Sequence, residues 1–285
     1  MTNLLSHLPF PVLYGISDFL SLVLRVVGYR SRVIDENLQR CFPEQTESWR
    51  KKTRREFYRR MADYFVESLK LGNMSEEQMR KHMVFNNQEL FDSLIAEGKS
   101  IAIYIGHCFN WEYTSSLPLW TKFRNVPNVE FFEIYRPLSN KYFDRLWIRL
   151  RSRFGVVPVP KNNTMRHLLS SHKQGIVSAT GFLADQRPSH NDKPYVVDFF
   201  GVPTNAIIGT EALARKLDMA HIFWDIRRIK RGYYAVDTRL LEADPSDDSP
   251  WPITQAYFHT LENAIRRDPP CWLWSHKRWK TLPAK

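Results

Sequence analysis

The chain has 285 residues, of which 43% are hydrophobic and 25% are charged, and this composition excludes an intrinsically disordered protein. Its formal net charge of +11 favours anionic partners, such as nucleic acid, anionic lipid head groups, phosphorylated substrates or an acidic carrier protein. Three widely spaced cysteines, Cys41, Cys108 and Cys271, include no C-x-x-C pair, so neither a disulfide framework nor a zinc site is predicted.

The first informative segment covers residues 8–28 and reads LPFPVLYGISDFLSLVLRVVG. Asp18 and Arg25 interrupt this apolar stretch, whereas a clean membrane span needs about 20 uninterrupted apolar residues. It also lacks the basic n-region and the small-residue cleavage site of a signal peptide. We therefore predict a helix that lies on or shallowly in a membrane, with a weak single span or a buried core helix as alternatives. Arginines near its end would keep the rest of the chain cytoplasmic.

Residues 31–80 are predicted to be helical and strongly basic. Apolar side chains recur there at steps of three and four residues, at Phe57, Met61, Tyr64, Phe65 and Leu69. Seven lysines or arginines fall between positions 50 and 60. This run is either an ordinary solvated helix face or a surface that meets anionic lipid.

From residue 86 the pattern changes to short apolar strands that alternate with amphipathic helices. Strands are predicted at residues 101–105, 129–135, 156–159 and 176–183. Helices are predicted from about residue 110 and at residues 140–153, 204–217 and 253–267.

Residues 221–229 and 233–241 are predicted to form an antiparallel hairpin, joined through Lys230-Arg231-Gly232. Together with the alternating strands and helices, this predicts an α/β fold with a mixed sheet flanked by helices. No Gly/Ser-rich linker divides the chain. We therefore predict a membrane-associating helix in residues 1–30 and a single catalytic domain in residues 31–285.

The segment that carries chemistry follows the first of these strands and reads GHCFNWE, residues 106–112. In open α/β sheets, ligands bind at the carboxyl ends of the strands. Residues five apart on a regular helix do not face each other, so His107 and Glu112 can meet only if the chain turns between them. Asn110 is a suitable N-cap for a helix that begins there, which would leave His107 in the turn and Glu112 in the first helical turn.

Such a pair has a clear chemical use. Histidine titrates near neutrality and can take a proton from an alcohol, while a carboxylate on its other nitrogen fixes the tautomer. The hydroxyl could then attack a thioester directly. The alternative is a buried histidine capped by a nearby acid, because a short His-x4-Glu pattern often occurs by chance. Cys108 is better explained as a small apolar residue than as a nucleophile.

Further polar candidates follow other predicted elements. Arg136 ends the second strand, and Arg149, Arg151 and Arg153 end the following helix. Arginine makes bidentate contacts to phosphate and carboxylate and can stabilise an oxyanion, although surface salt bridges explain Arg151 and Arg153 more simply. Asp185 ends another strand and could orient an arginine or an acceptor, or be a turn aspartate before a proline.

Residues 271–280 read CWLWSHKRWK and combine tryptophan with cations. Such a mixture suits a membrane interface, where tryptophan is enriched. It would also suit single-stranded nucleic acid, which binds by stacking and charge.

In their order along the chain, these pieces resemble the late acyltransferases of lipid A biosynthesis, which add lauroyl or myristoyl chains. That family belongs with the wider glycerolphosphate-acyltransferase-like superfamily. The resemblance covers most of the chain, and the matching pieces are GHCFNWE, IYRP, RLRS, ADQ before DFFG, GTEALARK and WLWSHKRWK. Together they are specific to the family but not to one acceptor.

The resemblance implies roles for individual residues. His107 and Glu112 match the family's catalytic histidine and acid, Arg149 matches its arginine in the Arg-x-Arg-Ser stretch, and Asp185 matches its later aspartate. Arg136 matches the Tyr-Arg-Pro arginine. We assign Arg136 and Asn110 to substrate binding and the other four residues to catalysis.

The resemblance also implies the reaction: acyl transfer from acyl-carrier protein to a 3-hydroxyacyl chain of a lipid A precursor, without metal or cofactor. The expected place is the cytoplasmic face of a bacterial inner membrane. Two departures lie close to the site. Phe109 stands where many relatives carry glycine, and Gln186-Arg187 replaces a frequent His-Asp. They leave the acceptor and the chain length open.

Three alternatives remain at this point. The same chemistry could act on another membrane lipid, such as an aminolipid, a glycolipid or a lysophospholipid. A basic nucleic-acid-binding protein is less favoured, because the cations are spread over several elements and no nucleic-acid module is recognised. A metal-dependent hydrolase could use His107, Glu112 and Asp185, but no second histidine lies at helical spacing from His107.

Overall fold

The computed structural model describes residues 2–189 and 194–280, which fold around a seven-stranded sheet and a two-stranded sheet. The larger sheet has the strand order β1-β9-β8-β2-β5-β3-β4, and the smaller one pairs β6 with β7. The strands are β1 Met83–Asn86, β2 Ile101–Ile105, β3 Val129–Tyr135, β4 Val157–Pro160, β5 Val177–Leu183, β6 Pro194–Phe199, β7 Val202–Ile207, β8 Ala220–Lys230 and β9 Tyr233–Leu240.

Strand directions make the larger sheet mixed, as predicted. β2, β5, β3 and β4 run parallel to one another, and β8 runs parallel to β2. β9 returns antiparallel to β8, and β1 pairs parallel with β9. The parallel strands end at one edge of the sheet, where polar side chains from separate parts of the sequence can meet.

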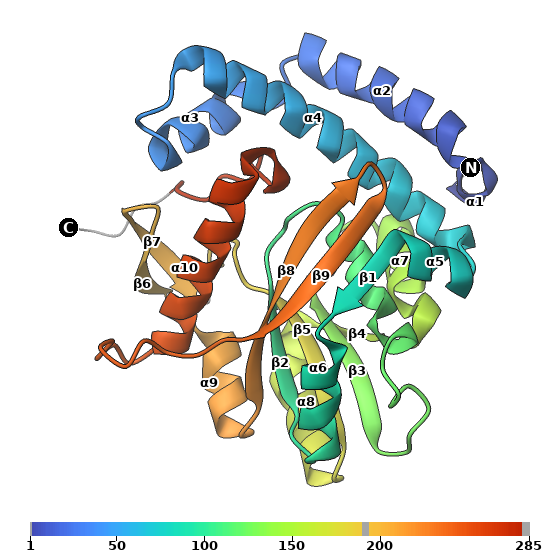
Figure 1. Ribbon diagram of the computed structural model, residues 1–285, viewed down its shortest axis with the longest axis vertical. Helices are drawn as coiled ribbons and strands as arrows, with labels where there is room; N and C mark the ends of the chain where they lie inside the picture. The colour runs from blue at the N-terminus through green and yellow to red at the C-terminus, as the bar shows by residue number, and fades with distance from the viewer. Residues whose placement is uncertain (1, 190–193, 281–285) are drawn as a thin grey trace.

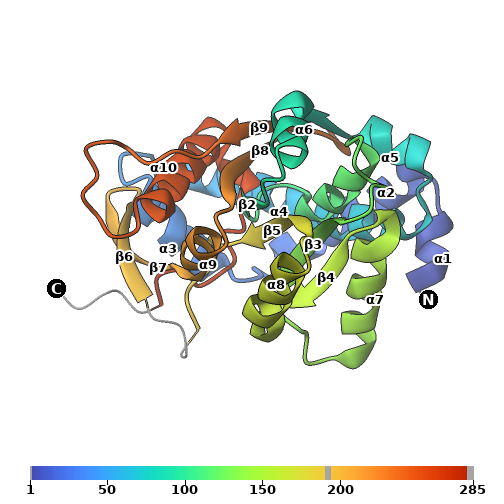
Figure 2. The ribbon, with the colours of Figure 1, turned by 90° about the horizontal axis from the view of Figure 1, so that it is seen from below.

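Helices cover both faces of the sheet, with α6 on one face and α8 on the opposite face (Figures 1 and 2). The α-helices are α1 Thr2–His7, α2 Phe10–Val26, α3 Ser31–Cys41, α4 Glu47–Lys70, α5 Glu76–His82, α6 Gln88–Ala96, α7 Lys141–Arg151, α8 Thr164–Lys173, α9 Gly209–Lys216 and α10 Pro252–Arg267. Short 3-10 helices are η1 Leu71–Asn73, η2 Trp111–Leu119, η3 Ser152–Phe154, η4 Lys161–Asn163 and η5 Pro269–Cys271.

One predicted helix is partly wrong. Residues 204–217 were predicted as a single helix, but the first part belongs to β7, and the helix α9 begins only at Gly209. The β7 strand pairs antiparallel with β6 and buries Thr204 and Ala206 on one side. This alternate burial has a period of two residues, which a strand requires and a helix does not.

Helix α4 lies across the edge at which the parallel strands end, and α2 packs along the outer side of α4 (Figure 1). Helix α2 buries Leu13 together with two small polar residues, Ser17 and Ser21. Its large apolar side chains are instead exposed, at Val12, Ile16, Phe19, Leu22, Val23 and Val26. The alternative of a buried core helix is therefore wrong, because the apolar face of α2 points away from the protein.

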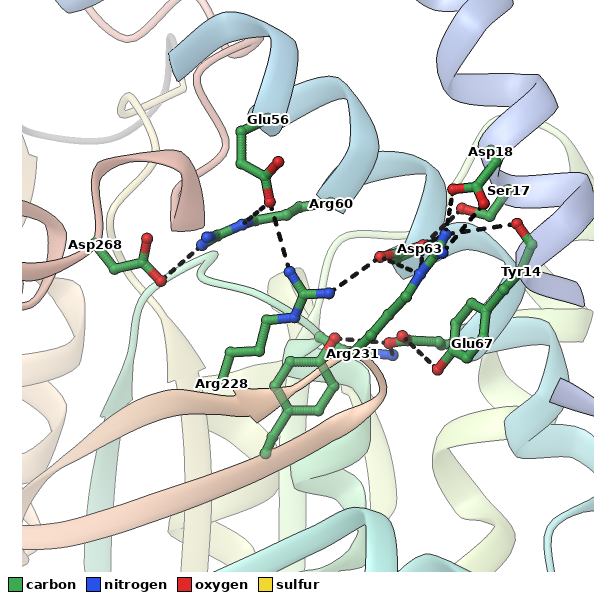
Figure 3. Close-up of polar contacts among 12 residues, drawn as sticks. Tyr14, Ser17, Asp18, Glu56, Arg60, Asp63, Glu67, Arg228, Arg231 and Asp268 are labelled. Atoms are coloured by element: carbon green, nitrogen blue, oxygen red, sulfur yellow. Dashed lines mark hydrogen bonds and ion pairs between the residues drawn. The ribbon is translucent and has the colours of Figure 1, made fainter. Parts of the chain in front are cut away.

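Polar contacts hold the inner face of α2 (Figure 3). The Ser17 hydroxyl donates to Asp63 of α4 over 2.7 Å, and the Arg231 guanidinium bridges Asp63 and Asp18 at 2.6 and 2.7 Å. Tyr14 donates to Glu67, one turn further along α4. An apolar helix attached through polar contacts is the reverse of the usual amphipathic arrangement.

Membrane-spanning length is reached in the described residues only by a bent pair of helices. Neither α2 nor any other single described helix is long and apolar enough to cross a bilayer. Taken together, α2 and α3 satisfy the criteria of length and composition, but they are bent by 86° relative to each other.

Candidate active site

The turn after β2 brings His107 to the carboxyl edge of the sheet. Gly106 begins the turn, and a Cβ atom there would lie 2.5 Å from a methyl carbon of Leu261, so only glycine fits without displacing that side chain. Phe109 has a φ of +52°, in the left-handed region that glycine adopts more easily. Its amide donates to the Cys271 carbonyl over 2.9 Å, and the Arg60 guanidinium lies over its ring. These contacts hold Phe109 in a backbone conformation that glycine would adopt more easily.

Asp185 is the carboxylate that contacts His107. Oδ1 of Asp185 lies 2.5 Å from Nδ1 of the His107 ring, and Oδ2 accepts the His107 backbone amide at 3.0 Å and the indole N–H of Trp272 at 2.6 Å. Burial by itself would raise the pKa of Asp185, but attraction to the His107 ring and these hydrogen bonds lower it to about 2. Asp185 therefore stays ionised and fixes the ring's tautomer.

The other ring nitrogen of His107 points to the side chain of Gln186. The two Nε2 atoms are 3.1 Å apart. Because Nδ1 carries its hydrogen toward Asp185, Nε2 is the acceptor nitrogen, and the Gln186 amide donates to it. This nitrogen is thus available to take a proton once Gln186 is displaced.

Glu112 does not contact His107, and our prediction that it holds the imidazole is wrong. Within the described residues, no hydrogen bond joins the two side chains, although both line the same cavity. The tight turn and η2 direct Glu112 toward α7, while Asp185 reaches the ring from β5, the neighbouring parallel strand. Sequence spacing alone could not distinguish these two carboxylates.

Glu112 is instead the centre of a buried ion pair. Arg151 donates from Nε and Nη2 to the two carboxylate oxygens, each over 2.7 Å. Tyr64, Trp111 and Trp147 also donate to Glu112, at 3.1 to 3.2 Å. Burial raises the pKa of Glu112, but the charge and hydrogen bonds of Arg151 outweigh burial and lower it. A carboxylate with this many donors is held rigidly in place.

Arg151 also contacts a second carboxylate. Its Nε lies 3.1 Å from Glu133 of β3. Burial and the charge of Glu112 raise the pKa of Glu133 to about 7, with Arg151 opposing them. Burial disfavours the charge of Arg151, but Glu112 and Glu133 together raise its pKa. This arginine is therefore largely buried and ionised, so the simpler surface explanation was wrong for Arg151.

Arg149 lies on the exposed face of α7 and does not line the cavity. Trp147 and Arg151 are four residues apart on this helix and both donate to Glu112, which helical geometry predicts for side chains at that spacing. Arg149 and Arg151 are two apart and point in different directions. The same periodicity in the sequence could have indicated Arg151.

Asn110 is fully buried and its side chain makes no N-cap hydrogen bond, so the predicted capping role is wrong. Its amide donates to Glu67 over 3.1 Å, and it does not line the cavity. Arg136, by contrast, is exposed and lines the cavity, and its role in substrate binding stays a prediction.

The cavity beside His107 has a volume of about 920 Å³, enough for a large ligand. Glu112, Arg151 and Gln186 contribute polar groups to its wall. Apolar side chains line it as well, among them Met165, Phe182, Ile207, Leu213 and Leu273. This combination suits a substrate that has a polar reacting group and hydrocarbon chains.

The tryptophans of residues 271–280 are buried, so our predictions that this segment meets a membrane or stacks on nucleic acid are wrong. Trp272, Trp274 and Trp279 are at most 7% exposed. Trp272 holds Asp185, and the Trp274 carbonyl accepts from Asn37 of α3. The segment therefore stabilises the site through its contacts with Asp185 and α3.

No group of three or more His, Cys, Asp or Glu side chains in residues 2–189 and 194–280 is arranged to hold a metal ion.

An ionised carboxylate on one nitrogen of a histidine, with the other nitrogen facing a cavity at the edge of an α/β sheet, is an arrangement suited to general-base catalysis on a hydroxyl group. Comparison with known proteins identifies the family. The family model for bacterial lipid A biosynthesis acyltransferases matches residues 1–281. The chain belongs to this family and is an acyltransferase.

Individual relatives are distant but match over most of their length. The chain is 24% identical to the lipid A biosynthesis palmitoleoyltransferase of Escherichia coli K12, covering 97% of this chain and 88% of that protein. It is 25% identical to the lauroyltransferase of the same organism, over 98% and 89%. An acyltransferase of lipid A biosynthesis from Haemophilus influenzae is 24% identical, over 84% and 72%.

Proposed function

We propose that the protein transfers a fatty acyl chain from acyl-carrier protein to a hydroxyl of a lipid A precursor, at the cytoplasmic face of a bacterial inner membrane. The observation that carries the proposal is the Asp185–His107 pair in a chain of this family, because His107 lines the 920 Å³ cavity and its Nε2 is not engaged by Asp185. The predicted His107–Glu112 pair is accordingly replaced by His107 and Asp185 as base and orienting acid.

In this mechanism Gln186 leaves Nε2 of His107 and the acceptor hydroxyl takes its place. Nε2 removes the hydroxyl proton while the oxygen attacks the thioester carbonyl carbon. The tetrahedral intermediate then collapses, the carbon–sulfur bond breaks, and the leaving thiolate receives the proton from the imidazolium. Asp185 stabilises the imidazolium between the two steps, in the way a triad carboxylate does.

We assign Arg151, in place of Arg149, to the charge that develops on the thioester oxygen. Glu112 accepts from Nε and Nη2 of this arginine, so Nη1 takes no part in the pair, and Arg151 lines the cavity. A cation that is fixed before the reaction stabilises developing charge without reorganising. Glu112 then acts by positioning Arg151.

The exposed apolar face of α2 supports attachment to a membrane surface. Phe19 and Val26 are 69% and 78% exposed, an unusual exposure for side chains of this size. An interfacial helix buries such a face in the boundary between head groups and acyl chains. Residues 1–30 are thus proposed as the attachment segment and residues 31–285 as the catalytic domain.

The test has two parts. Purified protein in detergent should transfer a labelled acyl group from acyl-carrier protein to a lipid acceptor, and His107→Ala should abolish transfer while its circular dichroism spectrum is unchanged. Mass spectrometry of lipids from a strain that lacks the protein should show lipid A without one secondary acyl chain. If another membrane lipid loses an acyl chain instead, the proposed acceptor is wrong but the proposed chemistry stands. Full activity in His107→Ala would reject the mechanism.

A further inference from the structure

Three cations follow three adjacent strands at the edge where His107 lies. Lys161 comes directly after β4, Arg136 directly after β3, and Arg187 four residues after the end of β5. These strands are neighbours in the order β5-β3-β4 and run parallel, so their ends meet at the same edge of the sheet. All three cations line the cavity that contains His107.

Contacts between the loops bring these strand ends together. Nζ of Lys161 lies 3.4 Å from the hydroxyl of Ser189, two residues after Arg187. The backbone amide of Arg187 is held by Nε2 of His276 at 3.3 Å. The loops after β4 and β5 therefore meet across the end of β3, which carries Arg136.

The acidic side chains of the cavity wall are already engaged elsewhere. Glu112 is paired with Arg151, and an oxygen of Asp144 accepts the Leu138 amide over 2.7 Å. Among the described residues, neither Arg136 nor Arg187 forms an ion pair with a carboxylate. An arginine without a carboxylate partner has donors available for a ligand anion, and the guanidinium fork matches phosphate.

We propose that Arg136 and Arg187, with Lys161 beside them, form a subsite for a phosphate group of a substrate whose hydroxyl or thioester reacts at His107. The inference rests on the proposed acyl transfer and adds a substrate feature to it. Two sources of phosphate fit this chemistry. One is the phosphodiester of the carrier's thiol-bearing arm, and the other is a phosphate on the lipid acceptor.

Binding is measured first, without acyl transfer. The full chain in detergent is unfolded thermally in inorganic phosphate and in chloride at equal ionic strength. A ligand that binds only the folded state raises the Tm. We expect phosphate to raise the Tm of the wild type, and the Arg136→Gln and Arg187→Gln variants to lose most of that shift. Arg149→Gln is the matched control, because it removes the same charge from the exposed face of α7.

Kinetics then identify the source of the phosphate. Each arginine variant should raise one KM by roughly tenfold or more, because a hydrogen bond to a charged group contributes about 1.5–3 kcal/mol. A rise confined to the carrier substrate assigns the subsite to its phosphodiester, and a rise confined to the lipid assigns it to the acceptor. A wild-type Tm equal in phosphate and chloride, or KM values unchanged for both substrates, overturns the subsite. The Tm shift does not depend on turnover. A protein that binds phosphate but transfers no acyl group would therefore reject the proposed function and keep the phosphate subsite.

Discussion

Asp185 has two hydrogen-bond donors from His107 and one from Trp272, and the last comes from a segment far along the chain. The indole N–H stabilises the ionised carboxylate without touching the cavity. It therefore acts on catalysis through the acid that orients the base.

We expect Trp272→Phe to lower kcat roughly tenfold or more with little change in either KM, because it removes one hydrogen bond to a buried charge, worth about 1.5–3 kcal/mol. Initial rates across a pH series check this. Without the indole hydrogen bond, the ionised Asp185 is less stabilised, and the acid limb of the kcat/KM profile should shift. Trp274→Phe is the control. It loses an indole bond to the Pro269 carbonyl, which is not bonded to Asp185, and should alter stability but not the pH profile.

Arg151→Lys should be severe although charge is kept. Lysine cannot make the bidentate contact with Glu112, so the cation would lose its fixed position. We expect kcat to fall by about 10²-fold, in the range for removing one preorganised oxyanion donor. Arg149→Lys, on the exposed face of the same helix, should match the wild type. Equal kinetics for the two variants would remove Arg151 from the mechanism.

The positions of the site residues could be predicted where the local sequence determines them, but their contacts could not where strand order determines them. His107, Asp185 and Arg136 were predicted at strand ends, and the carboxyl edge does bring them together: His107 and Arg136 line one cavity, and Asp185 contacts the His107 ring. The partner of His107 could not be predicted, because it depends on β2 and β5 being neighbours, and sequence does not give strand order. Arg149 and Arg151 lie on different faces of α7. The four-residue spacing between Trp147 and Arg151 already indicated that these two side chains share a face.

At the scale of elements, prediction succeeded where burial is simple. β2 and β3 have the predicted limits, and β2 in particular is a short apolar run that is buried along its whole length. The hairpin of β8 and β9 and the helix α10 also agree within one residue at each end. Strand β1 and the pair β6-β7 were missed, since their residues form strands only through pairing with distant segments.

The outward face of α2 gives a prediction of membrane affinity. Replacing Phe19 and Leu22 together by serine should lower binding to anionic lipid vesicles by about tenfold or more per residue, since a fully buried side chain of this kind contributes about 1.5–3 kcal/mol. The Tm should stay the same, because both side chains are exposed. Vesicle co-sedimentation measures the loss. Ser17→Ala is the converse control, with normal vesicle binding and a lower Tm, because it breaks the bond to Asp63.

Glu67 on α4 gives a prediction of pH-dependent stability. Burial, and then the charge of Asp63, raise the pKa of Glu67 from 4.5 to about 7. The folded state therefore binds this proton more tightly than the unfolded state does. The resulting stabilisation is complete below pH 4.5 and is lost as the pH rises to about 7.

In Glu67→Gln that titration is absent, so the free energy of unfolding should fall less between pH 4.5 and 7 than in the wild type. Denaturant unfolding at a series of pH values checks the slope, and only the difference between the two proteins is interpreted, because Glu133 titrates in the same range in both. The variant should be less stable overall, since a glutamine amide would face the Tyr14 and Tyr234 hydroxyls as well as Asn110. Identical slopes would show that Glu67 is ionised throughout.

At the scale of the whole molecule, the net charge of +11 favours an acidic carrier as donor. Long-range attraction raises the rate of encounter and weakens with salt. We expect kcat/KM for acyl-carrier protein to exceed that for a matched coenzyme A thioester at low salt, with a gap that narrows as ionic strength rises and little effect on kcat. Initial rates at saturating lipid acceptor measure this. A preference that persists at high salt would exclude steering, and activity with coenzyme A alone would exclude the carrier.

The position of Trp272 has a consequence for the making of this enzyme. Translation proceeds from the amino terminus, so the segment after α10 leaves the ribosome later than every element that it joins. Until then the turn at Phe109 lacks its partner carbonyl and Asp185 lacks its indole donor. A nascent chain can have formed α2, α4 and the parallel strands and still lack these supporting contacts. We therefore expect a chain that ends before Trp272 to be less active than the full chain.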